Sequence, residues 1–500
     1  MGSIPAGGTR IKQMTKYKIP NEVRKVSSVL TSAKFENYLV GGCVRDLILS
    51  KNPKDWDITT SATPEEIVSL FEHTFYENSF GTVGVVNDET KEGSLKVVEV
   101  TPYRSESEYT DFRHPDKVVW AKTLEEDLKR RDFTINALAY DLEKESLIDL
   151  FDGQADIKNK LIRTVGSPDE RFGEDALRML RSLRFASELG FAIESETLSS
   201  IEKNKNLLEK ISKERVRDEF VKIIMSDNPS VALGFATQLQ MLKYISPELE
   251  KGVGMEQNKS HIYTVWEHLI RSLDYSAEKK FPLHVRLAVL LHDIAKPHTR
   301  KKIDGEWTFY GHEVVGSKIA KNMLTDLKFP KEIVEKVVKL VRWHMFFSET
   351  ETITLSAVRR IVRNVGPELI WDLMDVRACD RTGMGRPKVT TYRLRKYHSM
   401  IEEVMRDPIS VKQLSINGKD IMEITSKSAG PHIGYILEIL LSEVLENPKN
   451  NDRKYLEERV LNLSNLKENE LAKLGKEARE SNESEDEREV RKIKEKYKVE

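Results

Sequence analysis

The sequence has few cysteines and no long apolar run. Its two cysteines, Cys43 and Cys379, lie far apart in a chain of 500 residues, which argues against a disulfide framework or a zinc site built from thiolates. No apolar stretch approaches the roughly 20 residues that are needed to span a bilayer. We therefore expect a cytoplasmic protein that works in reducing surroundings and has no membrane partner.

An excess of charge of one sign is also missing. The formal net charge is -1, so a nucleic-acid partner cannot be inferred from overall basicity, and any electrostatic footprint has to be local. Hydrophobic residues make up 39% and charged residues 32% of the chain, which is the ordinary balance of a soluble protein. A chain of this length is too long for one core and predicts three or four domains.

The order of the sequence patterns predicts an α+β protein. Short β-rich runs alternate with helical segments in the first third of the chain, whereas helical periodicity dominates afterwards. The last residues mix acids and bases with almost no large apolar side chains, which predicts a solvated helix or disorder. The expected regions are a disordered leader over residues 1–22, a small α/β head domain over 23–155, a helical neck over 156–250, a helical domain over 258–384, a C-terminal helical region over 385–465 and a charged tail over 466–500.

Two aspartates mark a candidate metal site in the head domain. In Lys54-Asp-Trp-Asp-Ile-Thr, strand alternation places Asp55 and Asp57 on one face of a strand. Adjacent carboxylates repel unless a cation lies between them, and two Mg²⁺ ions that bridge a triphosphate are the usual solution in phosphoryl transfer. Glu99, on another β-rich run, is a candidate third acid. A solvent-facing strand edge is the alternative for the aspartate pair taken alone.

A glycine turn precedes these aspartates. Gly41 and Gly42 separate a strand from a helix, and Arg45 follows one turn into that helix. Two glycines let the backbone approach a phosphate, the helix start offers free amides, and the arginine can add a charge-assisted bond. Taken alone, such a turn is equally often a purely structural feature.

Two arginines and two polar residues form a further candidate group. Arg130 and Arg131 stand just before an apolar segment and are suited to holding a triphosphate. Asp132 and Asn136 are suited to a ribose hydroxyl, with a local helix cap as the competing interpretation.

A later segment carries a charge at every third position. The run from Arg171 predicts a helix on which Asp175, Arg178, Arg181 and Arg184 share one broad face. Salt bridges within the helix are the alternative, but one acid against three arginines leaves an excess of positive charge. Asp175 and Arg178 are therefore candidates for reading a nucleobase edge, and the two later arginines for binding phosphates.

In this order and spacing, the segments resemble the class II tRNA nucleotidyltransferase and poly(A) polymerase family over roughly residues 36–225. The matching motifs are Gly-Gly-x-Val-Arg-Asp from Gly41, the Asp-x-Asp pair, Arg-Arg-Asp-Phe-Thr-Ile-Asn-Ala from Arg130, Glu-Asp-x-Leu-Arg-x-Leu-Arg from Glu174 and Ser-Lys-Glu-Arg-Val-Arg-Asp-Glu-Phe from Ser212. The resemblance implies a nucleotidyltransferase head domain with Mg²⁺ on the two aspartates. It also implies that Asp175 and Arg178 hydrogen-bond the incoming base in place of a nucleic-acid template. The candidate nucleotide-binding residues are then Gly42, Arg45, Arg131, Asp132, Asn136, Asp175, Arg178, Arg181 and Arg184.

The implied reaction is attack by a 3′-hydroxyl of RNA on the α-phosphate of an incoming nucleotide, with diphosphate leaving. The stretch from Tyr103 to Pro115 resembles the flexible loop of members that can add two C residues, and enzymes that add only the final A usually lack it. The sequence from Gly81 resembles the CCA-adding pattern more than that of bacterial poly(A) polymerases. We therefore expect addition of C, C and A to tRNA from CTP and ATP. A poly(A) polymerase, an A-only or CC-only enzyme, an inactive RNA-binding protein and a mainly hydrolytic enzyme are the alternatives.

A second group of potential ligands lies in a helical context. His292 and Asp293 end a mostly apolar run from Val285 to Leu291, and burying such a pair is costly unless it coordinates something. A single histidine on such a face is more often a core residue than a ligand. Here the potential ligands form a series: His268, His292, Asp293, His312, His344 and Asp380.

The order of this series resembles the HD phosphohydrolase superfamily over roughly residues 258–384. The resemblance implies a metal site, and His312 and His344 suggest room for two ions. Imidazole and carboxylate ligands suit Mn, Ni, Co, Fe or Zn, and the sequence does not choose among them. Similar fusions in bacterial CCA-adding enzymes hydrolyse 2′,3′-cyclic phosphates and 2′-phosphates. The segment from Ser415 resembles their C-terminal helical region, which implies that residues 385–465 bind the tRNA body, in a monomer or a homodimer.

Overall fold

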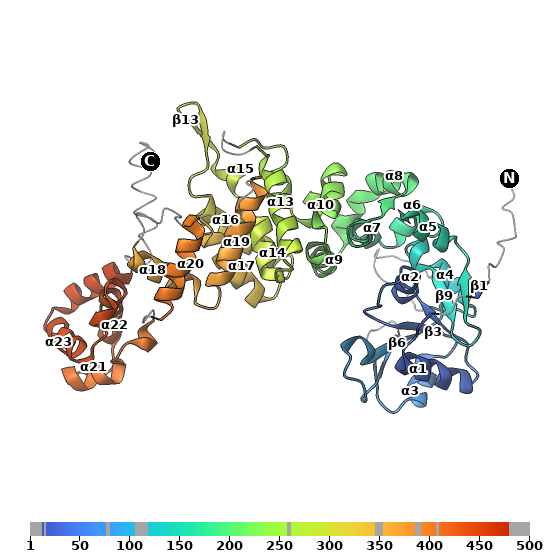
Figure 1. The fold of residues 1–500 in the computed structure, drawn as a ribbon, viewed down its shortest axis with the longest axis horizontal. Helices are drawn as coiled ribbons and strands as arrows, with labels where there is room; N and C mark the ends of the chain where they lie inside the picture. The colour runs from blue at the N-terminus through green and yellow to red at the C-terminus, as the bar shows by residue number, and fades with distance from the viewer. Residues whose placement is uncertain are drawn as a thin grey trace. The chain divides into compact units, whose positions relative to one another are not determined.

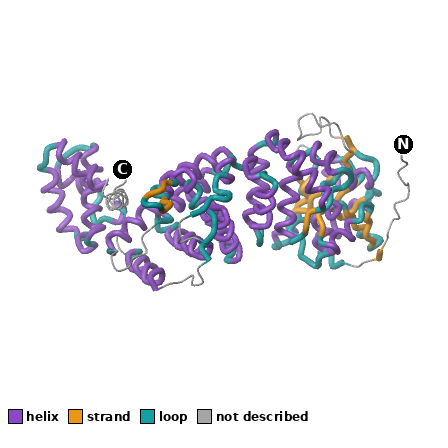
Figure 2. Tube along the Cα trace, turned by 90° about the horizontal axis from the view of Figure 1, so that it is seen from above, coloured by secondary structure: helices purple, strands orange, loops and turns teal. Residues whose placement is uncertain are grey.

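The computed structural model describes residues 13–14, 17–76, 81–105, 119–257, 262–345, 354–385, 392–406 and 410–479 (Figure 1). The chain divides into two compact units, Met1–Ile245 and Ser246–Glu500. Most strands belong to the first unit, whereas the second is built mainly from helices joined by loops (Figure 2). The predicted α+β class, with a small sheet-containing head followed by helical regions, is confirmed.

A mixed eight-stranded sheet forms the centre of the first unit. Its strand order is β1-β10-β9-β2-β3-β6-β5-β4, in which β3 and β6 are parallel and the other neighbours are antiparallel. Valine, isoleucine and threonine dominate β3 and β6, because β-branched side chains pack well on a pleated surface. The strands are β1 Gln13–Met14, β2 Asn37–Val40, β3 Asp57–Thr60, β4 Thr74–Tyr76, β5 Val83–Val86, β6 Val97–Pro102, β9 Leu138–Asp141 and β10 Ser146–Asp149.

The helices of the first unit begin and end at residues that favour these positions. Thr63 and Glu66 form a capping box at the start of α3, with Pro64 in the first helical position. α7 ends at Gly190, whose φ of 69° is left-handed. The helices are α1 Asn21–Ser32, α2 Gly42–Ile48, α3 Pro64–Leu70, α4 Leu124–Lys129, α5 Gly153–Asn159, α6 Pro168–Glu174, α7 Leu177–Leu189, α8 Ser195–Asn204, α9 Lys213–Met225, α10 Pro229–Gln238 and α11 Leu242–Ile245.

The predicted disordered leader over residues 1–22 differs from the structure in its second half. Gln13–Met14 pairs with β10 as an outer strand of the sheet. Ile19 is buried, the Tyr17 ring lies edge-on to Tyr140, and α1 already begins at Asn21. The pairing partner lies more than 130 residues away, so local composition could not reveal it.

Helices α13, α14, α16, α17 and α19 pack against one another in the second unit. α14 is buried from Val285 to Leu291, as its apolar run predicts. The hairpin of β13 Lys301–Ile303 and β14 Glu306–Thr308 interrupts the helices and is not expected from helical periodicity. The helices are α12 Pro247–Glu250, α13 Val265–Glu278, α14 Leu283–Leu291, α15 Lys296–Thr299, α16 His312–Asp326, α17 Lys331–Trp343, α18 Leu355–Val365, α19 Ile370–Gly383, α20 Tyr392–Val404, α21 Gly418–Thr425, α22 Pro431–Glu446 and α23 Arg453–Ser464.

The described part of the predicted charged tail is helical over residues 468–479. Leu471 is buried, so this segment is more than a solvated helix. Residues 480–500 lie outside the described part of the chain. Within the described residues, every helix is too short or too polar to cross a membrane.

Candidate active site and candidate metal centre

The structure pairs two of the three acids that the sequence predicts for the first site. Asp57 opens β3 and is the register partner of Glu99 on the parallel strand β6. The Glu99 amide donates a hydrogen bond to the Trp56 carbonyl at 2.9 Å, which fixes this register. Register partners on neighbouring strands point to the same face, so the two carboxylates share one side of the sheet. Both are half-buried, whereas Trp56, just before β3, is buried.

Asp55 lies outside the strand on which alternation places it. β3 begins at Asp57, and residues 54–55 form a bend in which Asp55 is exposed. The argument that strand alternation aligns Asp55 with Asp57 is therefore wrong, because the strand starts too late. Asp55 still lies two residues before Asp57 in the chain.

The glycine turn brings the backbone close to these acids. Gly41 has a left-handed φ of 76°. A Cβ atom added there would lie 3.0 Å from Nη1 of Arg131 and 3.4 Å from Oδ2 of Asp57. A side chain at this position would therefore fill the space between the guanidinium and the carboxylate, which leaves glycine as the residue that keeps it open. The arrangement fits a phosphate and its cation.

A chain of hydrogen bonds joins four more of the predicted residues. Arg45 donates to Oδ1 of Asn136 at 2.8 Å, and the Asn136 amide donates to Oδ1 of Asp132 at 3.2 Å. Arg181 on α7 then donates to Oδ2 of Asp132 at 2.8 Å. Burial raises the pKa of Asp132, but the charge and hydrogen bonds of Arg181 outweigh it and lower that pKa to about 2. Asp132 is thus ionised and links α2 to α7.

Asp127 is a site residue that the sequence reasoning missed. Its side chain is fully buried and accepts hydrogen bonds from Arg130 at 2.6 Å and from Arg131 at 3.2 Å. Burial raises the pKa of Asp127, and the two arginines lower it further than burial raises it. The spacing of three and four residues from Asp127 in α4 to the two arginines just after that helix is the signal that could have revealed it. Asp127 holds Arg131 in place beside Gly41.

The predicted single helix with Asp175 and three arginines is two helices with a break. Asp175 has extended backbone angles between α6 and α7, and its carboxylate accepts a hydrogen bond from the amide of Leu177 at 3.1 Å. Arg215 on α9 donates to both carboxylate oxygens of Asp175, at 3.1 and 2.7 Å. Arg215 belongs to the motif from Ser212 that carried the family resemblance, but the sequence did not indicate its partner.

The three arginines of α7 are neutralised by acids from neighbouring turns and helices, so the predicted excess of positive charge is wrong. Arg178 pairs with Glu174 at 2.6 Å. Arg181 pairs with Asp132 at 2.6 Å. Their partners lie outside the face that the sequence argument considered.

Arg184 is buried within ion pairs. It pairs with Glu219 and with Glu188, each at 2.7 Å, and its guanidinium lies 4.1 Å from the centre of the Phe185 ring. This placement favours a role in packing α7 against α9 rather than the predicted contact with phosphate.

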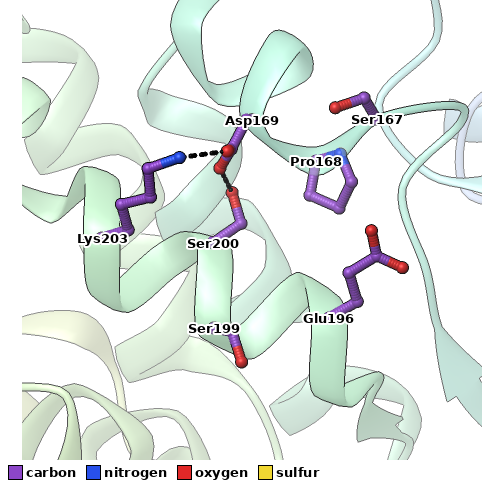
Figure 3. A pocket seen from close by; sticks show the side chains of 7 residues that line it. All are labelled: Ser167, Pro168, Asp169, Glu196, Ser199, Ser200 and Lys203. Carbon is purple, nitrogen blue, oxygen red and sulfur yellow. Dashed lines mark hydrogen bonds and ion pairs between the residues drawn. The ribbon is translucent and has the colours of Figure 1, made fainter.

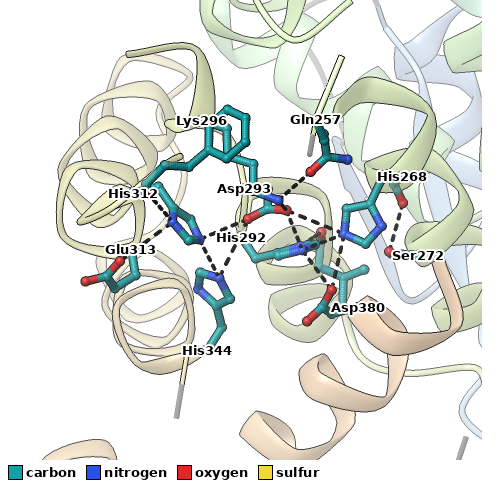
Figure 4. Close-up of polar contacts among 12 residues, drawn as sticks. Gln257, His268, Ser272, His292, Asp293, Lys296, His312, Glu313, His344 and Asp380 are labelled. Atoms are coloured by element: carbon teal, nitrogen blue, oxygen red, sulfur yellow. Dashed lines mark hydrogen bonds and ion pairs between the residues drawn. The ribbon is translucent and has the colours of Figure 1, made fainter. Parts of the chain in front are cut away.

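The second site gathers all six predicted ligands at the ends and centres of packed helices (Figure 4). Their potential ligand atoms form two sets, each within 4.8 Å, and every side chain is buried. The first set is His268, His292 and Asp380, and the second is Asp293, His312 and His344.

Asp293, a member of the second set, also faces the two histidines of the first. Its Oδ2 is 3.4 Å from Nε2 of His292 and 3.5 Å from Nε2 of His268. Its Oδ1 is 3.1 Å from Nε2 of His312 and 3.8 Å from Nε2 of His344. One carboxylate that faces two histidine pairs is the arrangement expected of a ligand that bridges two cations.

Backbone carbonyls orient three of the imidazoles. Nδ1 of His292, His312 and His344 each lies 2.7 Å from the carbonyl oxygen three residues earlier. A proton on Nδ1 satisfies this bond and leaves the Nε2 lone pair directed into the site, which is the tautomer that binds metals.

The charges at this site also suit cations. Burial raises the pKa of Asp293, but Lys296 and His292 lower it well below its usual range. Burial likewise raises the pKa of Asp380, but Arg377 and His268 outweigh burial and lower that pKa well below its usual range. Arg377 donates to Oδ2 of Asp380 at 2.5 Å, and Lys296 lies 2.5 Å from Oδ2 of Asp293. Both aspartates are therefore ionised. Lys296 and Arg377 are further residues of this site that the sequence reasoning did not single out.

A shallow depression of about 200 Å³ on the first unit lies apart from the predicted residues (Figure 3). Lys203 and Ser200 each bond the Asp169 carboxylate at 2.5 Å. An exposed ion pair and a further acid, Glu196, line the depression, and none of the residues predicted for the two sites lines it.

Three family descriptions match successive parts of the chain. Residues 37–163 match "Poly A polymerase head domain", residues 190–252 match "Probable RNA and SrmB- binding site of polymerase A", and residues 259–385 match "HD domain". The first match covers Asp57, Glu99 and Arg131, and the third covers all six potential metal ligands.

The chain is similar to CCA-adding enzymes over most of its length. It is 33% identical to that of Enterococcus faecalis over 450 residues, which span 88% of this chain and 95% of the relative. It is 48% identical to that of Ligilactobacillus salivarius over 230 residues, which span 45% of this chain and 55% of the relative. The crystal structure of the Bacillus stearothermophilus CCA-adding enzyme in complex with CTP matches with a TM-score of 0.68 at 27% identity, over 89% of this chain and 98% of the other. The predicted resemblance is confirmed, and the chain belongs to the family of CCA-adding enzymes.

Proposed function

We propose that this protein adds C, C and A to the 3′ end of tRNA from CTP and ATP without a nucleic-acid template. The observation that carries the proposal is the pairing of Asp57 with Glu99 on adjacent parallel strands, next to the open turn at Gly41. Family membership supports the same activity, since relatives over most of the chain are CCA-adding enzymes. It favours CCA addition over the poly(A) polymerase alternative.

Asp55, Asp57 and Glu99 are the proposed magnesium ligands and catalytic acids. Bound Mg²⁺ would neutralise the triphosphate, lower the pKa of the attacking 3′-hydroxyl and stabilise the leaving diphosphate. Gly42 offers its backbone amide at the start of α2 to the phosphates. Arg131, which Asp127 holds beside Gly41, contributes a fixed positive charge.

Asp175 and Arg178 are proposed to select the base. Each is fixed by another residue before a nucleotide arrives, Asp175 by Arg215 and Arg178 by Glu174. A site with fixed donors and acceptors leaves them unpaired when the wrong base enters, and that loss supports discrimination of roughly 10⁴ or more. Asp132 and Asn136 are proposed to contact the ribose, with Arg45 and Arg181 holding them in position.

Full CCA addition also depends on the loop predicted over residues 103–115. Residues 106–118 lie outside the described part of the chain. The described base of this segment is a two-stranded ladder, β7 Arg104–Ser105 and β8 Val119–Trp120, in which Arg104 is the partner of Trp120. We propose that this segment, as in CC-capable relatives, allows the two C additions.

The test is extension of a tRNA that ends at the discriminator base, supplied with CTP, ATP or both. The wild-type protein is expected to add two C residues with CTP alone and the full CCA with both nucleotides. Asp57→Ala should abolish extension. A ladder of many A residues from ATP alone would instead identify a poly(A) polymerase.

A second activity, hydrolysis of 2′,3′-cyclic phosphates and 2′-phosphates at RNA ends, is proposed for the second site. The two ligand sets joined by Asp293 support it, because their imidazoles and carboxylates fit two divalent cations. When bound, Mn, Ni, Co, Fe or Zn would supply a hydroxide at neutral pH that attacks the phosphorus. Removal of metal by a chelator should abolish hydrolysis of 2′,3′-cyclic AMP, and separate add-back of each ion should identify the active metal.

tRNA is the proposed macromolecular partner, and the cytoplasm, where tRNA ends are processed, is the proposed location. Residues 385–465 are proposed to hold the tRNA body. Light scattering of the purified protein, alone and with tRNA, would distinguish a monomer from a homodimer.

A further inference from the structure

The hairpin β13–β14 lies in the chain between two ligands of the metal centre, Asp293 and His312. It follows α15, which carries Lys296, and precedes His312 at the start of α16. The carbonyl of Phe309, just after β14, lies 2.7 Å from Nδ1 of His312, and Nζ of Lys296 lies 5.5 Å from the centre of the Phe309 ring. The base of the hairpin therefore forms part of the surroundings of the metal centre. Figure 1 shows the hairpin projecting from the helices of the second unit.

The two faces of this hairpin differ in charge. The turn at Asp304 and Gly305 has positive φ at both residues, which is typical of a tight two-residue hairpin loop. The register pairs Lys302 with Trp307 and Lys301 with Thr308. Because side chains alternate along a strand and register partners share a face, Lys302 and Trp307 lie on one face and Lys301 lies on the other.

Two cations gather on the face that carries Trp307. The guanidinium of Arg300 lies 3.6 Å from the centre of the Trp307 ring, and Nζ of Lys302 lies 5.7 Å from it. The acid of β14, Glu306, pairs in register with Ile303 and so belongs to the opposite face. Trp307 itself is half-buried and Lys302 is exposed.

Carboxylates do not neutralise these cations. Within the described residues, neither Arg300 nor Lys302 forms an ion pair, and Nε of Arg300 is buried without a hydrogen-bond acceptor. The arginines of α7 differ, since each of them meets an acid. Unpaired positive charge beside a flat aromatic and guanidinium surface is the combination that binds single-stranded RNA, through stacked bases and phosphate contacts.

We infer that the Trp307 face, defined as Arg300, Lys302 and Trp307, binds the single-stranded 3′ end of an RNA and guides its terminal phosphate into the metal centre. A base stacks on Trp307 and Arg300, and Lys302 contacts a phosphate of the strand. This inference rests on the proposed hydrolase function of the second site. It makes RNA ends, rather than free nucleotides, the substrates that this site favours.

The test compares hydrolysis of a short RNA that ends in a 2′,3′-cyclic phosphate with hydrolysis of 2′,3′-cyclic AMP by the metal-loaded full-length protein. Trp307→Ala and Lys302→Ala should each raise KM for the RNA about five- to twentyfold, since one stacking or phosphate contact is lost, and leave hydrolysis of 2′,3′-cyclic AMP unchanged. Trp307→Phe, which keeps a stacking ring, should restore most of the RNA preference. Lys301→Ala is the matched control, because it removes the same charge from the opposite face, and it should change KM for the RNA less than twofold.

A binding measurement separates this inference from the hydrolase proposal. Fluorescence anisotropy in the presence of a chelator reports binding of a labelled RNA with a 3′-phosphate without any turnover. Trp307→Ala and Lys302→Ala should weaken this binding about five- to twentyfold, and Lys301→Ala should not. Equal binding and equal RNA hydrolysis by all variants would overturn the inference, as would an equal loss on RNA and on 2′,3′-cyclic AMP. A wild-type protein that hydrolyses neither substrate would refute the hydrolase function, while the binding arm would still test the surface.

Discussion

Arg215 on α9 holds both carboxylate oxygens of Asp175, at 3.1 and 2.7 Å, across the break between α6 and α7. A bidentate pair of this kind fixes the carboxylate plane as well as its charge. Asp175 has no helix to orient it, because it stands between two helices with extended backbone angles. The proposed choice between bases therefore depends on a residue outside the set proposed to bind the nucleotide.

Replacement of Arg215 should reduce fidelity more than stability. We expect Arg215→Ala to lower kcat/KM for CTP and ATP about 10- to 100-fold and to raise the relative use of UTP and GTP, because Asp175 becomes free to rotate. Extension assays with each nucleotide measure this directly. Arg217→Ala is the control, since Arg217 pairs with the adjacent Asp218 on the same helix. Equal losses for all four nucleotides would argue for a purely structural role of Arg215.

The Asp132 carboxylate should make a pH-dependent contribution to stability. Its pKa is lowered from an ordinary 3.8 to about 2, so the stabilisation is fully present above about pH 4 and is lost as the pH falls through about 2. This lowering of the pKa corresponds to about 2 kcal/mol of stability. In urea unfolding followed by circular dichroism, Asp132→Asn should have a lower free energy of unfolding than wild type at pH 7, and this difference should be smaller at pH 3. An equal difference at both pH values would contradict the stabilising role of the ionised Asp132.

Arg184 should prove structural. Arg184→Met removes a buried partner of Glu219 and leaves that acid without its closest cation, a change that typically costs about 3–5 kcal/mol. We expect a lower thermal midpoint and, below that midpoint, less than a twofold change in KM for CTP. A large rise in KM for CTP with an unchanged thermal midpoint would instead support the predicted role of Arg184 as a phosphate ligand.

Metal content should follow the two ligand sets. We expect about two transition-metal ions per wild-type chain by elemental analysis, about one in His268→Ala or in His312→Ala, and fewer than one in Asp293→Ala, because the Asp293 carboxylate faces histidines of both sets. CCA addition by these variants should remain. Loss of one ion from Asp293→Ala with the other fully retained would show that its carboxylate does not bridge.

The sequence predicted the parts of both sites that short motifs carry. The glycine turn and the Asp-x-Asp pair combine residue type and spacing within a few positions, whereas the histidine series is recognised by its order over residues 268–380. The structure pairs Asp57 with Glu99, places Arg131 beside the glycine turn, and gathers all six ligands at the metal centre. Helical periodicity similarly predicted the long helical part, and the apolar run from Val285 to Leu291 predicted the burial of α14.

Pairings between distant elements could not be predicted from the sequence. Arg215 meets Asp175 across 40 residues, and β1 joins β10 across more than 130. The excess of positive charge predicted for α7 is also absent, because acids on other turns and on α9 pair with its arginines. A period of three residues predicted one continuous helix, whereas Asp175 accepts a hydrogen bond from the amide of Leu177 and lies outside both helices.

The most direct test is a crystal structure of the protein with CTP and magnesium. We predict metal ions between the triphosphate and the carboxylates of Asp55, Asp57 and Glu99, with the cytosine edge on Asp175 and Arg178. A bound CTP whose phosphates lie away from these acids, with no ion between them, would contradict the proposed polymerase site.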